Sequence, residues 1–138
     1  MCADATNTQE QQQQNRTIDV QLVDNWHARW PDVIAAIDHV GQRQSLNIDT
    51  DGWLSARHNL LVAFADDSIA GHLSFRVQPV RAKGGQPLMH LGRPMVEAQF
   101  ESMGVQPGFS RDEVERMLRA AAERRARTLR CQELIGFN

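Results

Sequence analysis

The segment 95–129 constrains the fold more than any other, because it joins a strand, a sharp break and a long helix. Apolar and polar side chains alternate from Met95 to Val105, which is typical of a half-buried strand. Pro107 and Gly108 end that strand. From Ser110 to Leu129 apolar residues recur at helical spacing, opposite a face rich in arginine. A strand that leads directly into a helix predicts a crossover to a parallel neighbour.

The rest of the sequence predicts further strands and one more helix. Alternation over Thr17 to Val23 indicates a strand, and helical spacing indicates a helix that starts near Trp30 and stops at Gly41. Two apolar runs around the turn Asp66-Asp67 predict a hairpin, and a loop rich in glycine follows it. The hairpin strands, the loop and a last short strand are expected at Leu60 to Ala65, Ile69 to Val77, Pro79 to Pro94 and Leu134 to Ile135. This order predicts an α+β fold, in which helices flank a sheet of mixed antiparallel and parallel strands.

Composition separates a polar tail from one domain. Residues 1–16 are rich in glutamine and have too little apolar surface to offset ordering entropy, so we expect a flexible tail. Residues 17–138 fit a single domain. The formal net charge is -2, and no apolar run approaches the ~20 residues of a membrane helix, so neither nucleic acid nor membrane is an expected partner. Cys2 and Cys131 lack the spacing of a disulfide framework or a metal site, and we expect a cytoplasmic protein.

The order of elements resembles the GNAT superfamily of acetyl-CoA-dependent N-acetyltransferases. In that family a long strand ends in a Val-x-Pro step, and a loop of the form Arg/Gln-x-x-Gly-x-Gly/Ala leads into an alanine-rich helix. Here Val105-Gln106-Pro107 matches the strand end, and the helix contains Ala120, Ala121, Ala122 and Ala126. The resemblance covers the chain from about Ile18 and is clearest from Val96 to Leu134. It implies a GNAT-like fold and transfer of an acetyl group to an amine.

The resemblance also implies a site for acetyl-CoA at the end of this strand. Backbone groups of Met103, Gly104 and Val105 would line a slot for the pantetheine arm. Ser110 and Arg111 would lie where the family binds the pyrophosphate with a helix N-terminus.

The sequence departs from the family pattern in that loop. Ser110 stands at the Arg/Gln position, and Glu113 and Glu115 stand at the two glycine positions. Each carboxylate close to a phosphate costs on the order of 1 kcal/mol. Ser110 and Glu113 also match a Ser-x-x-Glu capping box, which predicts that the helix itself uses the amide donors. We therefore expect a degenerate loop in which acetyl-CoA binding is weakened or lost.

Two carboxylates are the candidate catalytic residues. In some lineages of the family a glutamate on the long strand is the base, and that position falls near Gln99, which cannot accept a proton. Glu97 and Glu101 lie two residues to either side on the same strand face, and one of them could act through water. The simpler interpretation is that all three residues form the polar face of a half-exposed strand.

Other candidate side chains have structural interpretations. His72 and His90 are expected to be structural or solvated, and His58 has no partner at a recognisable spacing. Cys131 is expected to be a buried structural thiol. Trp26 and Trp30 are one helical turn apart, which predicts a core or interface stripe.

The sequence is compatible with two functions. The first is an N-acetyltransferase that acts on an amine of a small molecule or peptide. The second is a non-catalytic GNAT-fold protein that acts in dimerisation or partner binding. The sequence contains no tyrosine, which often supplies the acid in this family, and it ends before the last helix and two strands that the family usually has. A homodimer in which a second chain completes the sheet is therefore an expected assembly.

Overall fold

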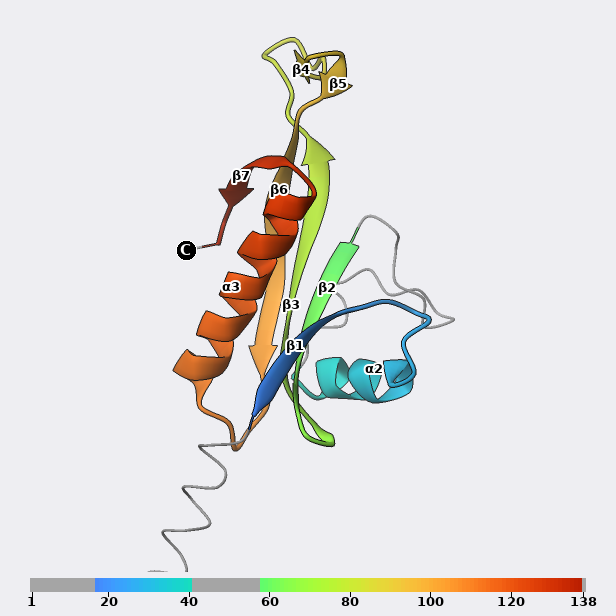
Figure 1. Ribbon diagram of the computed structural model, residues 1–138, viewed down its shortest axis with the longest axis vertical. Helices are drawn as coiled ribbons and strands as arrows, with labels where there is room; N and C mark the ends of the chain where they lie inside the picture. The colour runs from blue at the N-terminus through green and yellow to red at the C-terminus, as the bar shows by residue number, and fades with distance from the viewer. Residues whose placement is uncertain (1–16, 41–57, 138) are drawn as a thin grey trace, which may run out of the picture.

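The computed structural model describes residues 17–40 and 58–137, which build a five-stranded sheet and two helices (Figure 1). The strand order is β1-β2-β3-β6-β7; β6 and β7 are parallel, and the other neighbours are antiparallel. The elements of this sheet and its helices are β1 (Ile18–Val23), α2 (Trp30–His39), β2 (His58–Ala65), β3 (Ser68–Pro79), β6 (Val96–Val105), α3 (Arg111–Thr128) and β7 (Cys131–Ile135). The predicted mixed sheet with flanking helices is confirmed.

The two helices cover opposite faces of the sheet. Successive residues of a strand point to opposite faces, and β2 is apolar on both. One face packs against α3, in a core of Leu61, Ala63, Leu73, Phe75, Ala98, Val114, Leu118 and Ala122. The other face packs against α2, in a core of Val23, Trp30, Val33, Ile37, Leu60, Val62 and Phe64. The sheet is therefore the middle of three layers.

The predicted hairpin is present and longer than expected. Its turn is at Asp66 and Asp67, and Asp66 has φ +54°, a conformation that aspartate tolerates in tight turns. Strand β3 continues to Pro79 because β6 pairs with it along most of its length. The expected glycine-rich loop contains two short strands, β4 (Met89–His90) and β5 (Arg93–Pro94), and projects from one end of the sheet (Figure 1).

Strand β6 has a bulge at Glu101. Ser74 of β3 pairs with Ser102, whereas the next β3 residue, Phe75, pairs with Phe100. Glu101 is thus an extra residue that no β3 residue opposes, and the alternation of β6 changes phase there. Both Phe100 and Met103 pack against the α3-side core, although they are three residues apart.

Three smaller expectations need correction. Trp26 is 78% exposed and precedes α2, which begins at Trp30 with Pro31 in its first turn, so the two tryptophans do not form one stripe. Cys131, which was expected to be buried, is half-buried. The last strand, β7, begins at Cys131 and not at Leu134. The tail 1–16 and most of the segment between α2 and β2 lie outside the described residues.

Neither helix in the described part of the chain is apolar over enough residues to cross a bilayer.

Candidate active site

Glu101 is the centre of a buried polar cluster on the α2 side of the sheet. His58 Nδ1 lies 2.5 Å from its Oε1 atom, and Ser74 Oγ donates to the same oxygen at 3.2 Å. The side chains of His58 and Glu101 are only 3% and 12% exposed. The bulge points this carboxylate across β3 toward the first residue of β2. His58 therefore has a partner that the sequence did not indicate, because 43 residues separate the two.

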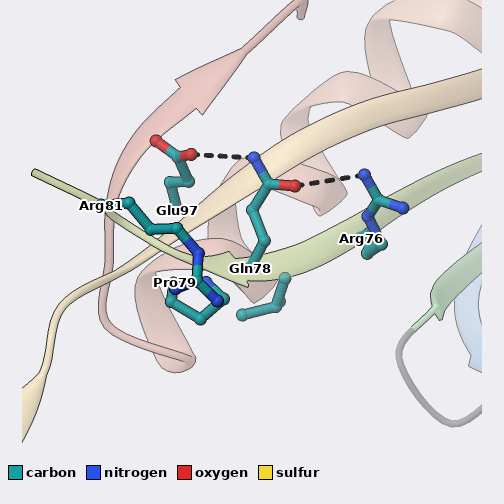
Figure 2. A pocket seen from close by; sticks show the side chains of 6 residues that line it. Arg76, Gln78, Pro79, Arg81 and Glu97 are labelled. Atoms are coloured by element: carbon teal, nitrogen blue, oxygen red, sulfur yellow. Dashed lines mark hydrogen bonds between the residues drawn. The ribbon is translucent and has the colours of Figure 1, made fainter. Parts of the chain in front are cut away.

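Glu97 belongs to a second polar group on the same face. Gln78 Nε2 donates to Glu97 Oε1 at 2.8 Å, and Arg76 Nη2 donates to Gln78 Oε1 at 3.2 Å (Figure 2). These three side chains line a pocket of about 720 Å³ together with Val77, Pro79 and Arg81. Glu97 and Glu101 share a strand face, as predicted, and they hydrogen-bond to different residues.

His72 lies deeper on this face and is 2% exposed. Burial lowers the pKa of its imidazole to about 4, so the ring is neutral at pH 7. Its Nε2 atom has no hydrogen-bond partner among the described residues. It pairs across the strands with Gly104, where an added Cβ would lie 2.9 Å from the ring. His72 is thus a structural residue, whereas His90 is exposed on β4.

Strand β6 is paired with β7 over only part of its length. The paired residues run from Val96, opposite Cys131, to Gln99, opposite Ile135. Met103, Gly104 and Val105 lie beyond the last of these pairs and are paired with β3 alone within the described residues. On the β7 side of these three residues, the backbone edge of β6 is therefore not paired with a described strand.

The start of α3 differs from the predicted capping box. Ser110 is the N-cap, but its side chain makes no capping hydrogen bond, and the first helical bond is Val114 N to Ser110 O at 3.0 Å. The first-turn amide donors are therefore not satisfied by Ser110. Arg111 Nε instead contacts Glu115 Oε1 at 2.9 Å, one turn along the helix. This ion pair offsets the charge of Glu115 and leaves Asp112 and Glu113 as the acids of the first turn.

Comparison with known proteins identifies the fold. No family model matches the chain. Solved structures match at a TM-score of 0.58 for a GNAT family acetyltransferase of Staphylococcus aureus and 0.61 for a ribosomal-protein-alanine N-acetyltransferase of Brucella melitensis. The S. aureus protein is 14% identical in sequence, and the match covers 86% of this chain and 84% of that one. The B. melitensis protein is 13% identical, and the match covers 86% of this chain and 78% of that one. The chain has the GNAT fold.

Two further comparisons qualify this result. The aminoglycoside N-acetyltransferase AAC(6')-Iy, solved in complex with CoA, matches with a TM-score of 0.58 and 16% identity over 86% of this chain and 75% of that one. A putative transposase of Sinorhizobium fredii is 33% identical over 81 residues, which are 59% of this chain. The chain spans 17% of the transposase, so that protein's activity does not carry over to the GNAT-fold chain.

Phe137 is among the residues of this GNAT-fold chain that the sequence did not indicate. The ring of Phe137 lies 5.9 Å, between centroids, from both Phe75 and Phe100 on the α3 side. The Arg119 side chain of α3 donates to the Phe137 carbonyl. The chain after β7 is thus held against the sheet beside β6. No sequence pattern indicates this contact, because a single aromatic residue after a strand has no periodicity.

Within residues 17–40 and 58–137, no group of three or more histidine, cysteine, aspartate or glutamate side chains could hold a metal ion.

Proposed function

We propose that this chain is an N-acyltransferase that moves an acetyl group from acetyl-CoA to an amine of a small molecule or peptide. The observation that carries the proposal is the position of Glu101. It lies at the bulge of β6, just beyond the last pair with β7, and His58 and Ser74 hold its carboxylate. A buried, oriented carboxylate beside a strand edge with which no described strand pairs suits removal of a proton from an amine.

The residues of this chain fit acetyl-CoA in part. Met103, Gly104 and Val105 offer backbone groups along the open edge of β6. The start of α3 offers amide donors and the positive end of the helix dipole to a pyrophosphate. Asp112 and Glu113 oppose that anion. We therefore infer that acetyl-CoA binds more weakly than it would to the same helix without these two acids.

In the proposed reaction Glu101 takes a proton from the acceptor ammonium. The neutral nitrogen then forms a bond to the thioester carbonyl carbon, and the carbon–sulfur bond breaks as the thiol leaves with a proton. His58 acts through Glu101, since its Nδ1–H donates to the carboxylate and keeps one oxygen in place. Acetyl-CoA supplies the activated acetyl group, and the chain supplies the proton acceptor and the geometry.

Calorimetry with acetyl-CoA is the direct test of this proposal. We expect saturable heat and tighter binding of acetyl-CoA than of 3′,5′-ADP, which lacks the pantetheine arm that the edge of β6 would hold. A panel of primary amines then tests for release of free CoA thiol. Absence of heat at millimolar acetyl-CoA would contradict the proposal.

A non-catalytic GNAT-fold protein is the second candidate. Two acids in the first turn of α3 favour it, as does β7, which lies at one edge of the sheet and exposes Leu134. Such an edge can pair with a strand of another copy, as in the expected homodimer. A dimer by light scattering, together with no binding of acetyl-CoA, is the result that would favour this candidate over the enzyme.

A further inference from the structure

The pocket at the far end of the polar face has the chemistry of a binding site that the acetyl-transfer proposal does not use. It lies where β3 ends and β6 begins, near the segment that carries β4 and β5. Its lining includes Arg76, Gln78, Arg81 and Glu97 (Figure 2). Its volume of about 720 Å³ is in the range of small-molecule sites. Two cations and one carboxylate give the pocket a net positive charge at neutral pH.

Arg76 is the residue in this pocket whose hydrogen-bonding groups and charge are least satisfied by the described residues. It is half-buried, and its Nε atom is buried without a partner among the described residues. Its Nη2 atom donates to the neutral Gln78. Within the described residues it forms no salt bridge. A half-buried guanidinium without a counterion is unfavourable, and a bound carboxylate would compensate it.

Gln78 lies between the positive and the negative side chain of the pocket. Its amide oxygen accepts from Arg76 while its amide nitrogen donates to Glu97, so the orientation of the amide is set by both neighbours. The cation and the carboxylate are thereby held on opposite sides of one side chain. Arg81 adds a second, exposed guanidinium at the wall, where one nitrogen donates to the Gly85 carbonyl. A ligand with adjacent carboxylate and ammonium groups matches this pattern of charge.

The pocket lies in line with Glu101 along the sheet. Arg76 pairs across the strands with Gln99, which is two residues before Glu101 on β6. Two strand residues span about 7 Å, which is close to the reach of a side-chain amine from its own α-carboxylate.

We propose that this pocket binds the carboxylate and α-ammonium groups of a free amino acid whose side chain carries a primary amine. Arg76 and Arg81 bind the carboxylate, and Glu97 accepts from the α-ammonium group. That the side-chain amine is the acetyl acceptor at Glu101 rests on the proposed function, whereas binding of the amino acid in the pocket does not.

Binding of L-lysine and of cadaverine, without any acetyl-CoA, tests the pocket. Cadaverine has the same amine-bearing chain and lacks the carboxylate. We expect L-lysine to bind about tenfold more tightly, as one charge-assisted hydrogen bond allows, and to shift amide NMR signals along β3 and β6. Arg76→Gln should abolish this preference. Arg93→Gln, which removes an exposed charge on β5 outside the pocket, should retain it.

Several outcomes overturn the proposal. Equal binding of the two amines, or no binding of L-lysine at high millimolar concentration, excludes a carboxylate site. Because Arg76→Gln could also disturb folding, Arg81→Gln is the second variant, and it changes an exposed side chain. If both variants keep the full preference, the carboxylate does not bind here. Binding of L-lysine by a protein that fails to bind acetyl-CoA would instead sink only the acetyltransferase proposal.

Discussion

At the residue scale, the bulge at Glu101 turns an ordinary strand glutamate into a buried one with two fixed partners. Glu97, four residues earlier on the same face, hydrogen-bonds to a glutamine instead. The two carboxylates are therefore a matched pair, since they are on one strand and differ in what surrounds them.

The first prediction uses that pair. Glu101→Gln should lower acetyl transfer about 100-fold or more, because an amide cannot accept the proton. Glu97→Gln is the comparison variant. Because Glu97 lies in the proposed amino-acid pocket, this change should raise the KM for the amine and keep the rate once the amine is saturating. Both variants should bind acetyl-CoA as the parent does. Equal rates for the parent and Glu101→Gln would remove Glu101 from the chemistry.

The second prediction concerns His72, whose pKa is lowered to about 4 by burial. A histidine with a folded pKa below its unfolded value of about 6.5 stabilises the fold above pH 6.5, and this contribution is lost as the pH falls from 6.5 toward 4. The loss should reach about 3 kcal/mol in the free energy of unfolding.

Urea unfolding of parent and His72→Gln between pH 7 and pH 4 measures this contribution. The variant should lose less stability on acidification, and His90→Gln, changed at an exposed position, should behave like the parent. The same pH dependence in all three proteins would show that His72 does not titrate as its burial requires.

At the element scale, the close packing of β3, β6 and α3 depends on glycine at one position. A Cβ on Gly71 would lie 2.7 Å from the Gly104 carbonyl oxygen of β6 and 2.9 Å from Val114 Cγ1 of α3. The first of these atoms is backbone and cannot move without shifting the strand. The helix and the two strands are thus fitted to each other at this point.

The third prediction follows from this contact. Gly71→Ala should reduce the free energy of unfolding by about 1–3 kcal/mol, as overpacking does in a dense core. Gly84→Ala is the matched control, because nothing lies within 4 Å of its added Cβ. Thermal or urea unfolding compares them, and a neutral Gly71→Ala would mean that β3 and β6 can separate at little cost.

At the scale of the whole molecule, charge is unevenly distributed along α3. Its first turn carries Asp112 and Glu113, and its last turn carries Arg125 and Arg127. This order complements the helix dipole, and it places negative charge where a GNAT fold would meet the phosphates of CoA.

The fourth prediction tests whether that charge limits cofactor binding. Asp112→Asn with Glu113→Gln should raise the affinity for acetyl-CoA by about fivefold or more, since each removed repulsion is on the order of 1 kcal/mol. Glu133→Gln, which removes an exposed charge on β7, is the control and should change little. Calorimetry at two salt concentrations measures both, and the gain should shrink at high salt.

The elements of this fold follow from local patterns in the sequence. Alternation predicted β1 and β6, two apolar runs around a turn predicted the hairpin, and helical spacing predicted α2 and α3. These signals are local, because period and turn residues act over a few neighbours. The shared face of Glu97 and Glu101 follows from the same period. The resemblance to the GNAT superfamily depended on this order and is confirmed at the level of the fold.

The site depended on contacts between residues far apart in the chain. No local pattern indicates that His58 meets Glu101, that Arg76 and Glu97 share one pocket, or that the Ser110 side chain makes no capping hydrogen bond. Periodicity was least informative at the bulge, where one extra residue changes the phase of β6. The sequence alone thus determined the main strands, the two helices and the faces that they bury, but not β4 and β5. Only the packing of the sheet decided which polar side chains meet, because that depends on register between strands, and register is a property of the assembled core.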